Sequence, residues 1–91
     1  MQGFYYVRTH DRQEREFLVK MFRNNGYSIE KDSRNLTEQD ILEDTLPFRV
    51  NMVSKEYGIM GNVTCAAAAA SSKALTEYDD FLQNNAEKFM F

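Results

Sequence analysis

The sequence predicts a small α+β domain of the ferredoxin-like type, in which a four-stranded antiparallel sheet of βαββαβ order carries two main helices on one face. Three observations predict this fold. Residues 4–9 are rich in aromatic and β-branched side chains, as is typical of a strand. Residues 12–24 form a capped segment of helical period, and residues 48–53 alternate apolar and polar side chains as a half-buried strand does. We therefore expect strands and helices to alternate within one unit.

The length and composition fit one domain built around an aromatic core. The chain has 91 residues, below the size at which chains divide into domains, and 13% of them are aromatic. We therefore treat residues 1–91 as a single domain. No apolar stretch approaches the ~20 residues that span a bilayer, and the first residues lack a signal-peptide pattern. With only one cysteine as well, we expect a cytoplasmic protein without a membrane contact.

The first helix has clear boundaries in the sequence. Asp11 and Glu14 have the spacing of a capping box, and Gly26 supplies the left-handed residue that ends a helix. We therefore expect a helix over residues 12–24. Its core-facing stripe is predicted to be formed by four apolar residues, Phe17, Leu18, Met21 and Phe22.

The middle of the chain predicts two strands and a short helix. Residues 27–30 alternate apolar and polar side chains, which indicates a second strand. Thr37 and Asp40 predict the cap of a brief helix that ends before Pro47. Residues 56–62 contain two glycines and predict a loop. The third strand, at residue 48, is expected to bury Phe48, Val50 and Met52.

The last third predicts one long helix, from about residue 63 to residue 84. It includes the alanine run at residues 66–70, which has high helix propensity. For residues 88–91 the sequence leaves a last strand and a helix tail equally open. The residues that we expect the long helix to bury are Ala67, Ala70 and Tyr78.

The charge is distributed unevenly along the chain. The net charge is −3, yet the first 34 residues carry seven basic and five acidic side chains, and the remainder carries four basic and nine acidic ones. Three basic residues of the first helix are candidates for binding an anion: Arg12, Arg15 and Arg23. The overall acidity argues against a dedicated duplex-DNA binder, because affinity there depends on neutralising phosphates. A module that binds RNA or a nucleotide through this helix and the first-strand aromatics stays open as an alternative.

Few side chains in the sequence indicate catalysis. Cys65 is predicted to lie in the first turn of the long helix, where a thiol is more acidic, and His10 is the only histidine that could serve it as a base. A cysteine in an alanine-rich helix is also a common core residue. No cluster of histidine and cysteine has metal-ligand spacing. We therefore expect no catalysis, no metal and no cofactor, and keep a thiol enzyme built on Cys65 as the minor alternative.

The first strand gives the strongest indication of function. Residues 4–7 place large apolar side chains on both faces of the strand, but two helices cover only one face of a four-stranded sheet. An exposed aromatic cluster edged by arginine is the usual composition of an interface core. We therefore expect a non-catalytic interaction module that binds a protein, either a second copy in a homodimer or a foreign partner that it regulates or inhibits, as small phage-carried domains do. The residues expected to contact the partner are Phe4, Tyr6, Arg8, Arg49 and Asn51.

Overall fold

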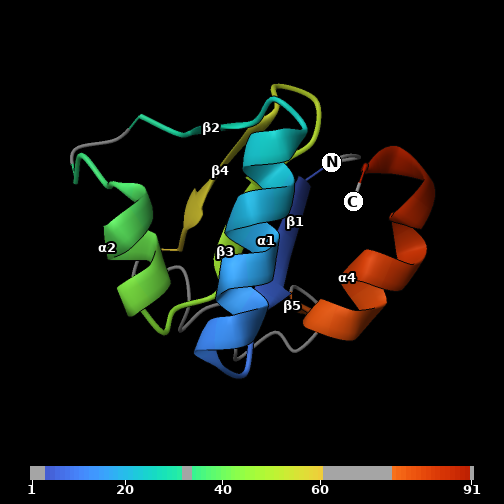
Figure 1. Cartoon of the computed structure of the whole chain (residues 1–91), viewed down its shortest axis with the longest axis horizontal. Helices are drawn as coiled ribbons and strands as arrows, with labels where there is room; N and C mark the ends of the chain where they lie inside the picture. The colour runs from blue at the N-terminus through green and yellow to red at the C-terminus, as the bar shows by residue number, and fades with distance from the viewer. Residues whose placement is uncertain (1–3, 32–33, 61–74, 91) are drawn as a thin grey trace.

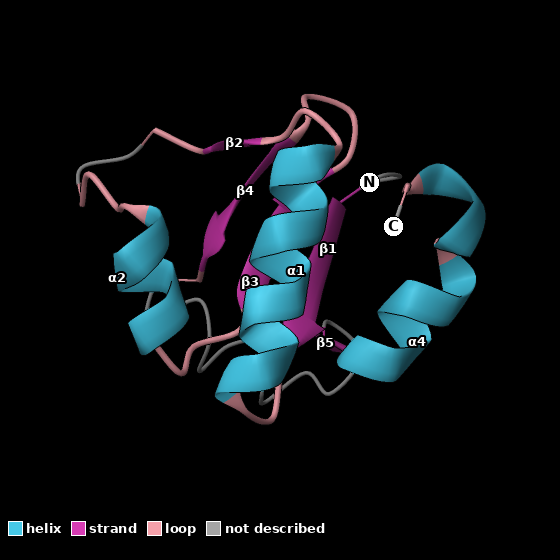
Figure 2. Cartoon of the chain, in the orientation of Figure 1, coloured by secondary structure: helices cyan, strands magenta, loops and turns pink. Residues whose placement is uncertain are grey.

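One mixed sheet organises the fold. The computed structural model describes residues 4–31, 34–60 and 75–90, with Phe4 described by its backbone alone. The elements are β1 (Phe4–Arg8), α1 (Arg12–Asn24), β2 (Ser28–Ile29), α2 (Glu38–Glu43), β3 (Phe48–Asn51), β4 (Glu56–Ile59), β5 (Leu75–Glu77), α4 (Tyr78–Asn84) and the 3₁₀-helix η1 (Ala86–Lys88). The five strands form a single sheet of order β2-β4-β3-β1-β5, and α1, α2 and α4 lie on one side of it (Figures 1 and 2). The α+β class is therefore confirmed. Within the described residues, none of the helices combines the length and the apolarity needed to cross a bilayer.

The strand β1 lies inside the sheet, antiparallel to β3 and parallel to β5. The register sets Tyr6 opposite Arg49 on β3 and beside Leu75 on β5. β4 is antiparallel to β3 and parallel to β2. The predicted contact between the first strand and the strand at residue 48 is confirmed. The ferredoxin-like expectation is not matched, because that plan has four antiparallel strands and this sheet has a fifth strand and two parallel pairs.

The strand β4 replaces the loop that the sequence predicted. Tyr57 and Ile59 are buried on the helix side of the sheet. Gly58 points the other way, and a Cβ at this position would come within 2.7 Å of Glu30 Oε1. The glycine therefore makes room for a neighbouring side chain and does not mark a turn. The turn lies earlier, where β3 ends at Asn51, two residues before the predicted end.

The chain re-enters the sheet at β5 instead of continuing one long helix. Three predicted residues, Cys65, Ala67 and Ala70, belong to the segment 61–74, which lies outside the described residues. Residues 75–77 pair in parallel with β1, so strand pairing prevails there over the helical tendency of the surrounding sequence. The α4 helix begins only at Tyr78. The predicted long helix is therefore wrong at residues 75–77.

The C-terminal tail is neither a strand nor a continued α-helix. After α4 it forms η1, and the extended residue that follows, Phe89, is buried. Asn25, just after α1, holds the tail with its side-chain amide: Nδ2 donates to the Met90 carbonyl at 2.9 Å, and Oδ1 accepts from the Met90 N–H at 2.8 Å. The amide thus takes the place of a strand partner and fixes the tail beside the core. Of the predicted range 88–91, Phe91 lies outside the described residues.

Two capped helices begin where the sequence predicts. At the start of α1, Asp11 Oδ1 accepts from the Glu14 N–H at 2.9 Å. The Glu14 carboxylate accepts from the His10 N–H at 2.8 Å, one residue before the position of a capping box. At the start of α2, Thr37 and Asp40 form the complete box. Local capping signals therefore predict both helix starts correctly.

Phe22 lies at the centre of the core between the sheet and the helices. Its ring is fully buried, with its centroid 4.9 Å from that of Tyr57 and 5.8 Å from that of Phe89. Phe17, predicted to be buried, is 39% exposed on the flank of α1, where its ring lies edge to face with Tyr78 at 6.4 Å. The residues buried as predicted are Leu18, Met21, Phe22, Phe48 and Val50, and Met52 and Tyr78 are partly buried against them.

Candidate functional site

The face of the sheet opposite the helices carries the residues that the sequence predicts to bind a partner. Side chains alternate along a strand, so Val7 on β1 and Val50 on β3 are buried beneath the helices while their neighbours point the other way. The register places Tyr6 opposite Arg49 on this second side. Phe4 belongs to the same side by its pairing with Asn51, but its side chain lies outside the described residues. We call this surface the sheet face; its described strand residues include Tyr6, Arg8, Arg49, Asn51, Leu75 and Glu77.

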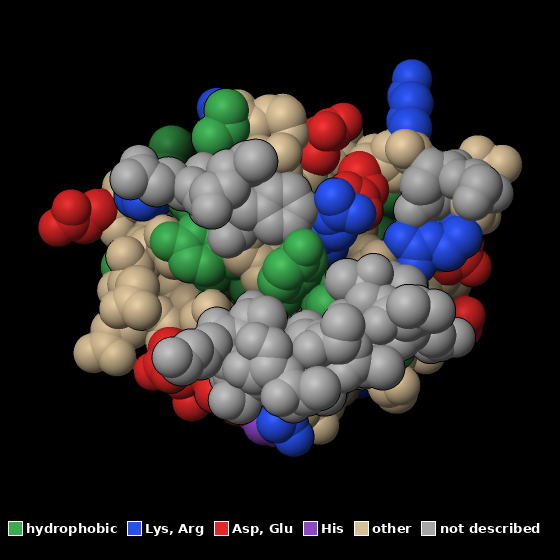
Figure 3. All heavy atoms as spheres, turned by 180° about the vertical axis from the view of Figure 1, so that it is seen from behind, with side chains coloured by type: hydrophobic (Ala, Val, Ile, Leu, Met, Phe, Trp, Pro, Cys, Tyr) green, Lys and Arg blue, Asp and Glu red, His purple; other side chains and the backbone are tan. Residues whose placement is uncertain are grey.

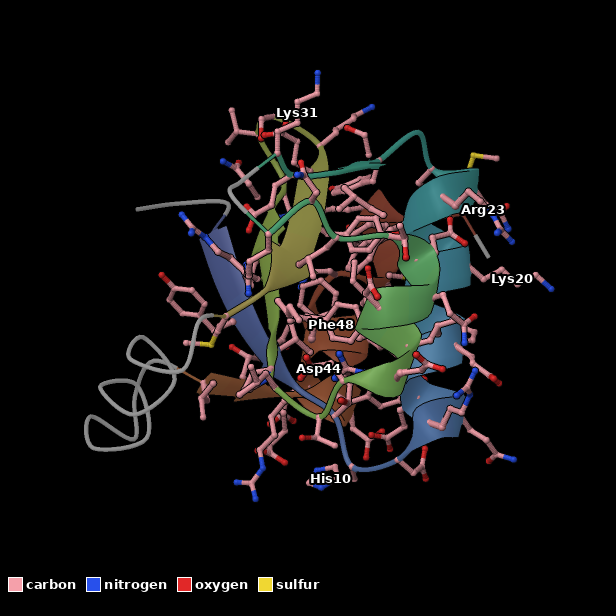
Figure 4. The ribbon with its side chains drawn as sticks, turned by 90° about the vertical axis from the view of Figure 1, so that its left-hand side faces the viewer. His10, Lys20, Arg23, Lys31, Asp44 and Phe48 are labelled. Atoms are coloured by element: carbon pink, nitrogen blue, oxygen red, sulfur yellow. The ribbon has the colours of Figure 1, made fainter. Side chains whose placement is uncertain are left out.

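None of the described helices covers the sheet face. In a view along the sheet, α1, α2 and α4 all lie on one side of the strands, opposite the sheet face (Figure 4). Seen from behind, hydrophobic side chains lie beside basic and acidic ones, between the atoms that are not described (Figure 3). Tyr6 is half-buried, and the side chains of Arg8 and Arg49 are 57% and 45% exposed. The face therefore presents an aromatic side chain together with two accessible guanidinium groups.

Each arginine of the sheet face has a carboxylate at its outer side. Arg8 Nη1 lies 3.9 Å from Glu77 Oε2 on β5. Arg49 Nε lies 3.9 Å from Oε2 of Glu30, which follows β2 and occupies the space above Gly58. Both distances exceed the ~2.8 Å of a tight charge-assisted hydrogen bond. Across the sheet the charges run negative, positive, positive, negative, with the positive pair in the middle.

The three arginines predicted to bind an anion do not form one surface. Arg12 Nε is 3.1 Å from Glu16 Oε2, and Arg23 Nη1 is 3.0 Å from Glu38 Oε1. These two arginines lie at opposite ends of α1, and each is neutralised by a neighbouring carboxylate. The sequence reveals the first pair by its spacing of four residues, whereas the second joins α1 to α2 and has no local signal.

Arg15, the third of these arginines, is a structural residue. It is 3% exposed, and its guanidinium carbon lies 4.5 Å from the ring centroid of Phe48. Nε and Nη2 donate to the Ile41 carbonyl at 2.9 and 2.7 Å, and Nη1 donates to the Leu46 carbonyl at 2.8 Å. Burial lowers the pKa of Arg15, and the nearby Asp44 carboxylate opposes that shift. The side chain therefore joins α1 to the end of α2, which corrects its expected role as part of an exposed anion site.

A cleft of about 410 Å³ opens between the start of α1 and the end of α2. His10 and Asp44 mark this end of the molecule in Figure 4. His10 Nε2 lies 2.8 Å from Glu77 Oε1, so the imidazole is tied to β5. Because the two arginines of the cleft are engaged as described, the carboxylates of its lining leave no surplus of positive charge for a phosphate. The cleft is lined by Thr9, His10, Asp11, Arg12, Arg15, Leu42, Glu43, Asp44 and Thr45.

The described residues do not bring together a set of metal-binding groups. No three His, Cys, Asp or Glu side chains among them converge as metal ligands do. The minor alternative, a pairing of Cys65 with His10, is not tested, because Cys65 lies outside the described part of the chain. His10 is instead bonded to a carboxylate on β5, an arrangement that orients an imidazole but supplies no nucleophile.

Sequence reasoning missed the two carboxylates that border the sheet face. The sequence predicts a helix at Glu77, whereas its approach to Arg8 depends on the pairing of β5 with β1. Glu30 reaches the face only because Gly58, on a different strand, lacks a side chain. The alternation of residues 48–51 contains the signal for Arg49 but none for its partner. Long-range pairing, which a single sequence does not display, brings both carboxylates to the site.

Comparisons with protein-family models, with curated proteins and with solved structures gave no match. The function is therefore argued from the geometry and the charges of the sheet face.

Proposed function

We propose that this protein is a small non-catalytic interaction module that binds a protein partner through the sheet face. The observation that carries the proposal is that every described helix lies on the other side of the sheet (Figure 4), while Tyr6, Arg8 and Arg49 share the side that none of these helices covers. Tyrosine and arginine are enriched at the centres of interfaces, where large side chains with polar tips contribute most of the binding energy.

The size of the molecule suits such a role. Its principal extents are 32 × 27 × 26 Å, so one face is comparable with the ~800 Å² that each partner buries in a standard interface. A domain of this size has one core, and that core occupies the helix side of the sheet. None of the described helices occupies the second side, which we propose as the contact surface.

We further propose that the module regulates or inhibits its partner and acts in the cytoplasm. Its single cysteine suits a reducing compartment. RNA or nucleotide binding is the weaker alternative, because Arg12 and Arg23 are paired with carboxylates and Arg15 is committed to backbone carbonyls. A foreign partner and a second copy are both compatible with this proposal, and the experiment below separates them.

The test compares two aromatic substitutions on opposite sides of the sheet. Tyr6→Ser alters the sheet face, and Phe17→Ser alters an exposed ring on α1. Light scattering at tens of micromolar reports self-association as a mass near twice 10.7 kDa, and affinity capture followed by hydrogen-exchange footprinting reports foreign partners. We expect Tyr6→Ser to weaken binding at least tenfold while its circular dichroism is unchanged, and Phe17→Ser to bind as the wild type does. Normal binding by a folded Tyr6→Ser variant contradicts the proposal.

A further inference from the structure

We infer that Asn25 is a modification site: deamidation of its side chain is controlled by the docked C-terminal tail, and the product of the reaction loosens that tail. The inference goes beyond the proposed function, because neither Asn25 nor the tail belongs to the sheet face. It concerns the point where α4 and η1 bring the chain back to the end of α1 (Figure 1).

The first step is the residue that follows Asn25. Gly26 is exposed, and a Cβ built at this position would have no heavy atom within 4 Å. Because glycine has no side chain, its backbone nitrogen is the least hindered nucleophile that can attack the amide of a preceding asparagine. Every other asparagine in the sequence is followed by a residue with a side chain. Asn25 is therefore the asparagine with the greatest intrinsic tendency to deamidate.

The reaction needs only water as a co-reactant. The Gly26 backbone nitrogen forms a bond to Asn25 Cγ while the Cγ–Nδ2 bond breaks, and the proton of the attacking N–H leaves with the amide nitrogen as ammonia. One water molecule then opens the cyclic imide at either of its carbonyl carbons. The products are aspartate and isoaspartate, in which the main chain runs through the former side-chain carbon. Each product has one carboxylate more and one side-chain amide less than the protein before the reaction.

The second step is that the docked tail restrains the reacting groups. Asn25 Nδ2 donates to the Met21 carbonyl at 2.7 Å and to the Met90 carbonyl at 2.9 Å, and Oδ1 accepts from the Met90 N–H at 2.8 Å. The Gly26 N–H donates to the Arg23 carbonyl at 3.2 Å, so the attacking nitrogen is itself held in the last turn of α1. Attack on Cγ requires the side chain to turn away from its partners, which the two bonds to Met90 oppose. The reaction therefore proceeds from the conformation in which the tail has detached.

The third step is the effect of the product on the tail. Aspartate at this position keeps an acceptor for the Met90 N–H but loses the donors to the Met21 and Met90 carbonyls. A carboxylate oxygen then lies close to two carbonyl oxygens, which is repulsive. The other anchor of the tail is Phe89, whose buried ring lies 5.7 Å from that of Tyr27. Chain ends fray unless they are tied down, so the loss of one of the two anchors makes the tail detach more often.

The first experiment follows deamidation of the full chain at mildly alkaline pH by peptide mapping with mass spectrometry. We expect aspartate and isoaspartate to form at Asn25 at least tenfold faster in concentrated urea than in the folded protein. Phe89→Ala weakens the anchor of the tail and should accelerate the reaction of the folded protein at least fivefold, because the rate follows the population of the detached tail.

The matched control for this substitution is Ile41→Ala, which removes a buried side chain of α2, on the other side of α1 from α4 (Figure 1). It should change the rate at Asn25 less than twofold, because it leaves the tail in place. Phe89→Leu serves if Phe89→Ala does not fold, and circular dichroism verifies each variant.

The second experiment tests the consequence with Asn25→Asp, which supplies the carboxylate of the product. Hydrogen exchange of the Met90 N–H, measured by nuclear magnetic resonance, should become at least fivefold faster. Asn24→Asp is the control, because it adds the same charge one residue earlier, at an exposed position of α1. It should leave the exchange of the Met90 N–H within twofold of the wild type.

Each part of the inference has an outcome that overturns it. Deamidation at Asn25 that is no faster than at Asn24 or Asn84 in urea overturns the site. Equal rates in urea and in the folded protein, or equal effects of Phe89→Ala and Ile41→Ala, overturn control by the tail. Unchanged exchange of the Met90 N–H in Asn25→Asp overturns the effect of the product.

Discussion

The two faces of the sheet use the same strands for different purposes. On β1, Val7 is fully buried, and the next residue, Arg8, has a side chain that is 57% exposed. On β3, Phe48 is fully buried, and the next residue, Arg49, has a side chain that is 45% exposed. The helix side is packed with aromatic rings, whereas the sheet face carries charges and one described tyrosine. The comparison teaches that the packed core of the described residues lies on one side of the sheet, so the other side can carry polar residues of the kind that the proposed recognition requires.

The largest expected effect is the loss of the ring at the centre of the core. Phe22→Ala should destabilise the fold by about 3–5 kcal/mol, because it opens a cavity among five aromatic rings. Arg49→Ala on the sheet face should change the free energy of unfolding by less than about 0.5 kcal/mol. Urea unfolding followed by circular dichroism measures both. Equal effects of the two substitutions would remove the distinction between the faces.

A second prediction compares a buried arginine with an exposed one on the same helix. Arg15→Ala should cost about 2–4 kcal/mol, because the carbonyls of Ile41 and Leu46 lose their donors. Arg12→Ala removes only an exposed pair between residues i and i+4, worth about 0.3–0.5 kcal/mol. Thermal unfolding of both variants gives the comparison. A loss from Arg15→Ala as small as that from Arg12→Ala would show that α2 does not depend on this side chain.

The smallest expected effect on stability appears only at alkaline pH and comes from Tyr57, a buried residue on the helix side of the sheet. Burial raises the pKa of Tyr57 from 10.0 to about 12, with a further contribution from Glu38 and an opposing one from Arg23. The folded state therefore holds the phenol proton more tightly than the unfolded state does. Stability from this source is complete below pH 10 and should fall by about 2–3 kcal/mol as the pH rises from 10 to 12, at ~1.4 kcal/mol per pH unit.

The control for this titration is Tyr57→Phe, which keeps the ring but has no phenol to ionise. Its stability should decline less steeply than that of the wild type in urea unfolding between pH 9 and pH 11.5. Burial also raises the pKa of Tyr27 and Tyr78, so a residual decline is expected in the variant. Identical pH profiles for the two proteins would show that Tyr57 ionises as readily in the folded state as in the unfolded state.

The parts of the fold that the sequence predicts are those with local signals. Asp11 and Thr37 mark helix starts through caps a few residues long, and the alternation after Phe48 assigns each residue of β3 to a face. The strands β4 and β5 were missed because Gly58 resembles a turn residue and the residues before Tyr78 resemble a helix. The strand β5 takes its conformation from pairing with the distant β1, whereas β4 pairs with β3 across the turn at residues 52–55 and with β2.

The residues of the candidate site also divide into those with a local signal in the sequence and those without one. Tyr6, Arg8 and Arg49 were predicted because alternation along a strand determines the face on which each residue lies. Their bordering carboxylates were not predicted, because strand pairing and the gap at a glycine bring them to the face. Arg15 was placed with exposed arginines because its type is rarely buried, and only the carbonyls at the end of α2 explain its position.

The position of β1 inside the sheet has a consequence for how the chain acquires its structure. Tyr6 pairs with Arg49 and with Leu75, which are 43 and 69 residues further along the chain. During synthesis the aromatic first strand therefore leaves the ribosome long before either neighbour exists. Pairings between distant residues slow folding, typically to milliseconds or longer, and leave strand edges exposed meanwhile. The nascent chain thus passes through a stage in which its most apolar strand has no partner and is open to aggregation or to capture by a chaperone.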